Sequence, residues 1–315
     1  MGRISWLKGV QSGFYTTWLL GKIVFPVTFI VTALGFTPIM EKIVGLVAPV
    51  MKWFGLPGEA AVPLVLGNFL NLYAAIGGIL SLDLTVKEVF IVAVMLSFAH
   101  NIFIETGVAL KVGVKLWIVL LVRYGLAFLS AFAISRLWDG GSGLAQYGFA
   151  QAAARHADGF WDVIFQSIGK AASGVLQLAI IVIPLMIFIQ IMKDLKWIDF
   201  ISNKTDFITG AFGMGRNASL TLISGLFFGL AMGAGVMIQA VREDGVTKKD
   251  ATLAIIFLAG CHAVVEDTLI FIPLGIPVLP LLAIRLVVAA VLTVIVGNVW
   301  KRTELRKRKE TELSL

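Results

Sequence analysis

Two stretches of this chain, residues 171–192 and 279–300, consist mainly of apolar side chains. A helix of about 20 predominantly apolar residues crosses the hydrocarbon core of a bilayer, which is about 30 Å thick. The whole sequence is 58% hydrophobic and 14% charged, whereas soluble domains are about 45–50% apolar and about 25% charged. The chain is therefore predicted to be an all-α polytopic membrane protein, because no stretch alternates apolar and polar residues as transmembrane β-strands do.

The charged residues predict how the chain is oriented. Much of the net charge of +7 lies in the tail 301–315, which begins KRTELRKRK. Cationic segments beside membrane helices stay on the cytoplasmic side, so we expect a multi-pass protein of the bacterial cytoplasmic (inner) membrane with a cytoplasmic C-terminus. The apolar run after Arg3 and Lys8 is too long for a cleaved signal peptide, and the single cysteine, Cys261, excludes an internal disulfide.

The sequence also repeats itself. Residues 85–138 align without a gap on residues 247–300, 162 positions later, and Glu105 falls on Asp267. Upstream of one loop the offset becomes 158, so that Gly67 falls on Gly225. The chain has three histidines and two of them match, which chance agreement of apolar residues does not explain. The distinctive identical matches are His100/His262, Thr106/Thr268, Gly113/Gly275, Arg123/Arg285 and Trp138/Trp300.

Each copy is predicted to contain the same elements. A proline-containing membrane helix is followed by an amphipathic interfacial segment and then by a helix rich in small residues. Next comes a helix that carries the matched histidine and, at its end, the matched acid, followed by a break and a last helix. Eight spans are expected, with ten as the alternative if interfacial or broken (re-entrant) segments also cross. In the first copy the segments are 13–35, 37–55, 57–80, 87–105 and 114–138, and in the second they are 171–192, 193–213, 217–240, 249–267 and 277–300.

This pattern predicts the organisation of the chain. The predicted parts are an N-terminal interfacial segment 1–12, a first membrane repeat 13–138, a linker 139–170, a second membrane repeat 171–300 and a basic tail 301–315.

The repeated motif places a histidine, an acid and an arginine within apolar helices. Ionisable groups at membrane depth are paired or functional. His100 and His262 either lock a helix by bonding to a backbone carbonyl, or contact a ligand, relay a proton or bind a metal. Charge pairing of the acids with Arg123 and Arg285 would leave Glu266 as a surplus carboxylate. The expected pairs are Glu105 with Arg123 and Asp267 with Arg285, or the exchanged pairs.

These residues define the predicted sites. Asn68 and Asn71 join them because the second copy has no polar residue at either position, so they either connect helices or contact a polar ligand. The predicted substrate-binding residues are His100, Glu105, Thr106, His262, Glu266, Asp267, Thr268, Asn68 and Asn71. The candidate metal ligands are Cys261, His262, Glu266 and Asp267, a set that suits a borderline divalent ion.

Two motifs resemble a known family. The run WFGLPGEAAVPLVLGNFLNLYAAIGGI with SFAHNIFIETG, and the later FGMGRNASLTLISGLFFGLAMGAGV with GCHAVVEDTL, are similar to the Gate, or nucleoside-recognition, domain. That domain occurs in concentrative nucleoside transporters, the ferrous-iron permease and spore maturation proteins A and B. The resemblance covers most of both repeats and implies a membrane transport scaffold built from helical repeats.

The patterns together predict a secondary transporter, proton- or ion-coupled, for a small polar solute such as a nucleoside-like molecule. Its site would lie at the membrane midplane between the two motifs. The alternatives are a divalent-metal permease and a non-transporting membrane partner or lipid-handling protein. Neither an enzymatic activity nor a cofactor is expected, because no nucleophile–base pair or cofactor fingerprint occurs. The expected partners are the lipid bilayer and a small-molecule or ion substrate, not nucleic acid, with a homo-oligomer or a paired membrane protein left open.

Overall fold

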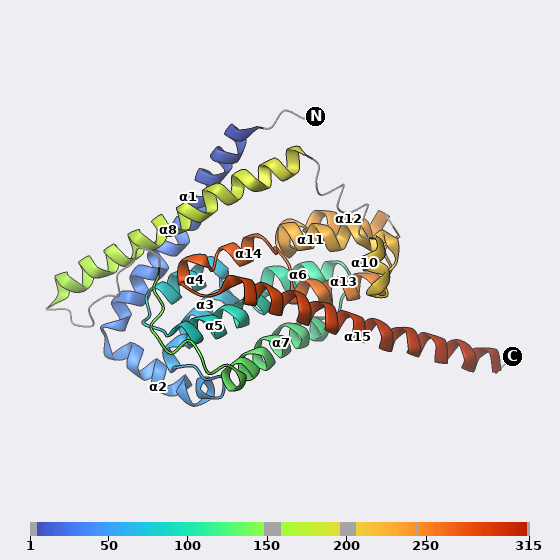
Figure 1. The fold of residues 1–315 in the computed structure, drawn as a ribbon, viewed down its shortest axis with the longest axis horizontal. Helices are drawn as coiled ribbons and strands as arrows, with labels where there is room; N and C mark the ends of the chain where they lie inside the picture. The colour runs from blue at the N-terminus through green and yellow to red at the C-terminus, as the bar shows by residue number, and fades with distance from the viewer. Residues whose placement is uncertain (1–4, 148–158, 196–205, 244, 314–315) are drawn as a thin grey trace. The chain divides into compact units, whose positions relative to one another are not determined.

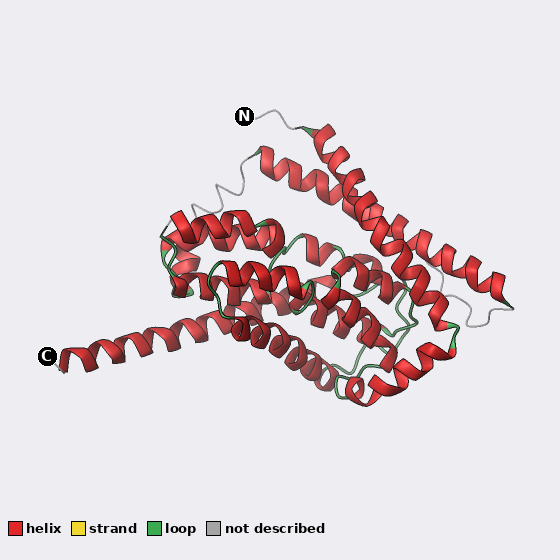
Figure 2. Cartoon of the chain, turned by 180° about the vertical axis from the view of Figure 1, so that it is seen from behind, coloured by secondary structure: helices red, strands yellow, loops and turns green. Residues whose placement is uncertain are grey.

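The computed structural model describes residues 5–147, 159–195, 206–243 and 245–313. Every regular element in these ranges is a helix (Figure 2). Five helical stretches in the described ranges are long and apolar enough to cross a membrane. These findings agree with the predicted all-α membrane class. The five stretches are Trp6–Gly35, Val86–Lys111, Leu116–Leu137, Phe160–Ile191 and Val278–Glu304.

The helices follow one another in the order shown by the colours of Figure 1. They are α1 Trp6–Gly35, α2 Pro38–Lys52, η1 Gly58–Ala60, α3 Ala61–Phe69, α4 Leu72–Leu80, α5 Val86–Phe98, α6 Ile102–Lys111, α7 Leu116–Leu137, α8 Phe160–Asp194, α10 Asp206–Ala211, η2 Arg216–Ala218, α11 Ser219–Met232, α12 Ala234–Glu243, α13 Lys248–Gly260, α14 Glu266–Leu269, η3 Ile272–Leu274 and α15 Val278–Leu313.

The chain forms two compact units. Unit 1 consists of Met1–Phe103, Tyr124–Leu195 and Glu266–Leu281, and unit 2 consists of Ile104–Arg123, Lys196–Val265 and Leu282–Leu315. Helices α6, α7 and α15 therefore contribute residues to both units. The predicted domain boundaries remain predictions. Residues 148–158 of the predicted linker and 196–205 of the second amphipathic segment lie outside the described residues.

In unit 1, α1 and α8 lie side by side as an antiparallel pair (Figure 1). The backbone N–H of Ser5 donates to the Asp194 carboxylate at 2.8 Å, which joins the start of α1 to the end of α8. A Cβ placed on Gly13 would lie 2.9 Å from the Cα of Ile183. The absence of a side chain at Gly13 therefore permits the close approach of the two backbones.

The small-residue segment of the first copy forms two short helices in unit 1, α3 and α4, which pack on each other. Nine residues make each helix about 13 Å long, less than half of the roughly 30 Å hydrocarbon core. Asn71 adopts an extended conformation, and its side chain accepts a hydrogen bond from the Ala74 N–H at 2.9 Å. The prediction of one helix over 57–80 is therefore wrong, because Asn71 starts a new helix as an N-cap.

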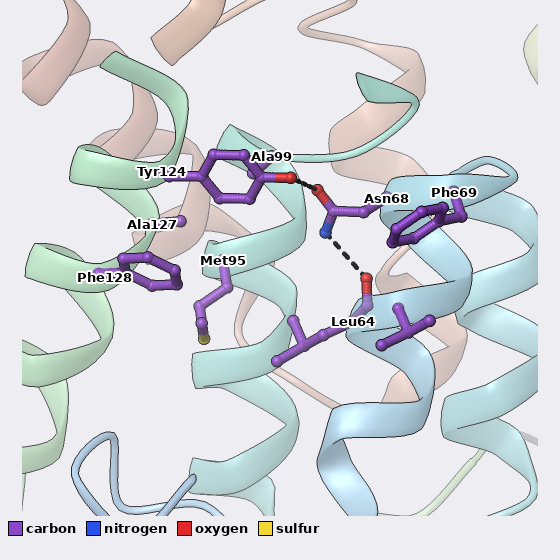
Figure 3. A pocket seen from close by; sticks show the side chains of 9 residues that line it. Leu64, Asn68, Phe69, Met95, Ala99, Tyr124, Ala127 and Phe128 are labelled. Atoms are coloured by element: carbon purple, nitrogen blue, oxygen red, sulfur yellow. Dashed lines mark hydrogen bonds between the residues drawn. The ribbon is translucent and has the colours of Figure 1, made fainter. Parts of the chain in front are cut away.

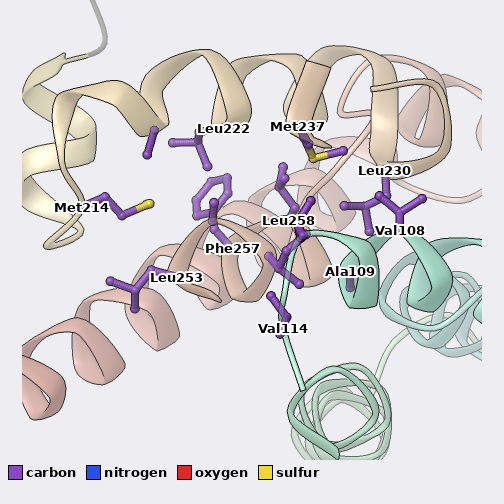
Figure 4. Close-up of a cluster of buried hydrophobic side chains, with 14 of the residues drawn as sticks. Val108, Ala109, Val114, Met214, Leu222, Leu230, Met237, Leu253, Phe257 and Leu258 are labelled. Atoms are coloured by element: carbon purple, nitrogen blue, oxygen red, sulfur yellow. The ribbon is translucent and has the colours of Figure 1, made fainter. Parts of the chain in front are cut away.

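The corresponding segment in unit 2 is also interrupted. Gly229 has φ 77° and ψ 173°, a conformation that glycine adopts without a side-chain clash. The chain changes direction there, so the prediction of one continuous helix over 217–240 is also wrong. Helices α11, α12 and α13 enclose a cluster of apolar side chains that includes Leu222, Met237 and Phe257 (Figure 4).

The two motif helices begin in the same way. Thr85 accepts a hydrogen bond from the Glu88 N–H while the Glu88 carboxylate accepts one from the Thr85 N–H, which forms a capping box. At the offset of 162, Thr247 caps α13 and accepts from the Asp250 N–H. Asp250 also accepts from the Gly215 N–H at 3.0 Å, which holds the loop between α10 and η2 against the start of α13.

The motif helices end before the acidic residue and not after it, which corrects the predicted break. Helix α5 ends at Phe98 and α13 ends at Gly260. Asn101 and Ala263 then have left-handed backbones with φ 46° and 42°. Their N–H groups donate to carbonyl oxygens of the short helices, Asn101 to Gly67 at 2.8 Å and Ala263 to Gly225 at 3.1 Å. These tertiary hydrogen bonds stabilise both breaks, the first of which has no proline or glycine within residues 97–101.

Candidate functional site

Each motif histidine is fixed by one ring nitrogen at the end of its helix. The Nδ1 atom of His100 lies 2.7 Å from the carbonyl oxygen of Leu96, and that of His262 lies 2.7 Å from the carbonyl oxygen of Leu258. A carbonyl only accepts hydrogen bonds, so Nδ1 carries the proton in both rings. The helix-locking bond to a backbone carbonyl is therefore present in both copies, and it leaves the Nε2 atom of each ring without a proton to share with that carbonyl.

Unit 2 contains a buried ionic cluster around Glu105. Its carboxylate lies 2.8 Å from Nη2 of Arg123 and 3.4 Å from Nε2 of His262. Glu105 is 3% exposed, Arg123 is 0% exposed and His262 is 1% exposed. Arg285 donates from Nη2 to the carbonyl oxygen of His262 at 2.6 Å. The predicted pair of Glu105 and Arg123 is therefore confirmed.

Burial makes this cluster energetically important. Opposite charges about 4 Å apart attract by about 4 kcal/mol at an effective dielectric constant near 20. The carboxylate of Glu105 receives this attraction from Arg123 and a further contact from His262. The adjacent Thr106 is buried, and its hydroxyl has no hydrogen-bond partner among the described residues. Cys261 is buried in the same unit at the end of α13.

Unit 1 contains a second polar group of residues. The Tyr73 hydroxyl donates to Oε1 of Glu266, so the predicted surplus carboxylate has a phenol partner. A ring nitrogen of His100 and a carboxylate oxygen of Asp267 lie within 4.8 Å of each other. Thr268, next to Asp267, is buried.

Each of these two polar groups combines a histidine from one sequence copy with an acid from the other. In unit 1, His100 of the first copy lies near Asp267 of the second. In unit 2, His262 of the second copy lies near Glu105 of the first. Each histidine therefore approaches the acid of the other copy, an arrangement that the sequence analysis did not foresee.

Tyr73 is a functional candidate that the predicted site omitted. At the repeat offsets its counterpart is Ala231, and the counterpart of Glu266 is Ile104. Two polar residues that each lack a polar counterpart thus bond to one another in the fold. The lack of a polar counterpart marks both residues as candidates, but it does not pair them, because Asn68 and Asn71 are unmatched in the same way.

The two predicted asparagines have different surroundings. Asn71 acts as the N-cap of α4. Asn68 lines a cavity of about 230 Å³ in unit 1, where it accepts a hydrogen bond from the Tyr124 hydroxyl at 3.0 Å (Figure 3). Of the predicted metal ligands, Cys261 and His262 belong to unit 2, and Glu266 and Asp267 belong to unit 1.

Apolar helices of membrane-spanning length, together with a buried carboxylate, a buried histidine and two buried arginines, define a polytopic helical membrane protein. Within that class the chain belongs to the Gate family, described as nucleoside recognition, whose model matches residues 17–115 and 175–291. The chain is 57% identical over 296 residues to YvoD of Bacillus subtilis (strain 168), an uncharacterized membrane protein, with 94% of this chain and 95% of YvoD covered. No solved structure matches the chain significantly.

Proposed function

We propose that this protein is a secondary carrier, driven by a proton or ion gradient, for a small polar solute such as a nucleoside-like molecule. The observation that carries the proposal is the buried cluster of Glu105, Arg123 and His262 next to helix breaks. Ionisable groups inside membrane segments are costly and mark substrate, ion or proton pathways. Membership of the Gate family supports the same class of function.

The proposed scaffold consists of two homologous repeats of about eight spans in total, with ten as the alternative, and includes broken or re-entrant helices. Its support is that local geometry recurs at the repeat offsets. Both histidines bond to the carbonyl four residues earlier, and both breaks bond to a glycine carbonyl of the short helices. Broken helices at equivalent places in two repeats accompany midplane binding sites in transporters.

In this proposal each unit offers polar groups to the solute. Glu105 and the Thr106 hydroxyl are the candidate hydrogen-bonding groups of unit 2, and Asp267 and Thr268 are those of unit 1. His100 and His262, held through Nδ1, would present Nε2. We assign no enzymatic chemistry to these residues. The proposed location is the bacterial inner membrane, with α15 carrying the basic tail into the cytoplasm.

Thermal unfolding of the detergent-solubilised protein tests the proposal. The protein would be heated with uridine, adenosine, sodium phosphate or manganese chloride, and the same series would be run with Glu105→Gln and His262→Gln. We expect one organic solute to raise the Tm of the wild type and not of the variants, and proteoliposomes to accumulate that solute when a proton or sodium gradient is applied. The proposal would be abandoned if no solute binds or accumulates while both variants simply unfold earlier.

A second candidate, a divalent-metal permease, is favoured by the approach of His100 to Asp267 in unit 1. An imidazole nitrogen and a carboxylate oxygen within 4.8 Å can serve as two ligands of one divalent ion. This alternative predicts that manganese raises the Tm of the wild type, that His100→Gln and Asp267→Asn each remove the effect, and that uridine and adenosine have none.

A further inference from the structure

Unit 1 has a cavity at a place where the matching residues of unit 2 are packed. The cavity lies between α3, α5 and α7 (Figure 3). Its lining includes Asn68, Met95 and Ala99. Their counterparts at the repeat offsets are Leu226, Phe257 and Cys261. Phe257 and Cys261 belong to the buried apolar cluster of unit 2, and the partly buried Leu226 packs against it. The cavity is therefore a local departure from the repeated scaffold, not a consequence of it.

One wall of the cavity is polar and has unused hydrogen-bonding capacity. Nδ2 of Asn68 donates to the Leu64 carbonyl at 2.8 Å, and Oδ1 of Asn68 accepts from the Tyr124 hydroxyl at 3.0 Å. The Leu64 carbonyl only accepts, which fixes the orientation of the amide. A primary amide has two N–H groups and two acceptor positions, so one donor and one acceptor of Asn68 remain for a ligand.

The other walls are apolar and aromatic. The rings of Tyr124 and Phe128 are stacked with centroids 5.8 Å apart, and Phe69 also lines the cavity. Phe69 and Phe128 are exposed apolar residues, and Phe128 lies on α7, a helix of membrane-spanning length. Exposed apolar surface on such a helix faces lipid. A molecule that enters past these rings arrives from the hydrocarbon region and is uncharged.

We propose that this cavity binds a small uncharged aromatic molecule that partitions into the bilayer and carries one hydrogen-bonding group. An engineered cavity of about 150 Å³ lined by Leu, Ile and Phe binds benzene. A cavity of about 230 Å³ therefore has room for a bicyclic ring such as indole. The ring would pack against Tyr124 and Phe128, and its N–H would bond to Oδ1 of Asn68. A lipid acyl chain would fill the volume but leave the second N–H and the second acceptor position of the Asn68 amide unused.

The test uses 5-fluoroindole as the probe, observed by fluorine NMR with the full-length protein in detergent micelles. Met95→Phe and Asn68→Leu introduce the residues of the second copy, the first to fill the cavity and the second to remove its polar wall. Leu129→Phe is the matched control, because Leu129 is exposed on α7 and does not line the cavity. Circular dichroism establishes that each variant is folded, and Ala99→Leu replaces Met95→Phe if the latter is not.

We expect a saturable shift of the fluorine resonance in the wild type and in Leu129→Phe. Met95→Phe should abolish the saturable component, and Asn68→Leu should weaken binding by about five- to tenfold, the value of one hydrogen bond. Equal, non-saturable shifts in all four proteins would show partition into the micelle alone and overturn the proposal. Displacement by 1-hexanol, combined with no effect of Asn68→Leu, would assign the cavity to acyl chains and overturn it as well.

Discussion

Separating Arg123 from Glu105 should reveal how strongly the buried ion pair is coupled. Arg123→Met keeps an unbranched apolar stem and removes the cation, while Glu105→Gln keeps the shape of the acid and removes its charge. The two side chains are 0% and 4% exposed and lie 2.8 Å apart. Removing one partner of a buried pair costs about 3–5 kcal/mol, because the other charge is left uncompensated.

The double variant removes both charges, so its decrease in the free energy of unfolding should be smaller than the sum of the decreases caused by the two single substitutions. We expect a coupling energy of about 2–3 kcal/mol, within the range found for directly contacting residues. The assay is equilibrium unfolding in mixed micelles with an increasing mole fraction of SDS, followed by circular dichroism.

The exposed pair of Lys249 and Glu304 provides a control in the same unit. Its atoms lie 3.1 Å apart, but the side chains are 25% and 53% exposed. A cycle of Lys249→Met and Glu304→Gln should give a coupling energy below about 1 kcal/mol. If the losses of Arg123→Met and Glu105→Gln are additive to within about 0.5 kcal/mol, the pair is hydrated and the argument for a dry ionic cluster is refuted.

Three further predictions use the same unfolding assay. Gly67→Ala would place a Cβ in steric overlap with a methyl group of Leu96, and Gly225→Ala would do the same with Leu258, so each should lower the free energy of unfolding by about 1–3 kcal/mol. Gly107→Ala is the control, because a Cβ there has no atom within 4 Å, and it should not be destabilising. Equal losses of stability at all three positions would contradict the steric reasoning. Thr85→Ala should lower the free energy of unfolding by about 1 kcal/mol and speed amide hydrogen exchange in the first turn of α5. Unchanged exchange in that turn would argue against the capping box. Tyr73→Phe should lower the free energy of unfolding by about 1.5–3 kcal/mol, because it removes a hydrogen bond to the Glu266 carboxylate. A decrease below about 0.5 kcal/mol would show that this hydrogen bond contributes little to stability.

The local elements of this fold were predictable where the signal lies within a few neighbouring residues. The starts of α5 and α13 follow from Thr85 and Thr247, each three residues before an acid. The length of the apolar run near the end of each copy predicted a last helix, and these helices are observed as α7 and α15. The pairing of Glu105 with an arginine followed from the cost of leaving either charge alone in an apolar surrounding, but the choice of Arg123 over Arg285 came from the structure.

The helix breaks were misplaced because their cause is not local. Asn101 and Ala263 adopt left-handed backbones that cost an alanine about 1–2 kcal/mol. Hydrogen bonds to the carbonyls of Gly67 and Gly225 offset this cost, and those partners lie more than 30 residues away in the sequence. The approach of each histidine to the acid of the other copy also depends on the tertiary fold, so periodicity and spacing contain no sign of it.

The hydrogen bonds at the two breaks join main-chain atoms, which affects how such a protein evolves. Asn101 and Ala263 have unlike side chains, yet both donate the same backbone N–H to a glycine carbonyl. Every residue has a backbone carbonyl and every residue except proline has an N–H, so these bonds require only that positions 101 and 263 tolerate a left-handed backbone. A substitution that meets this requirement changes the side chain next to the motif histidine and leaves the break itself in place.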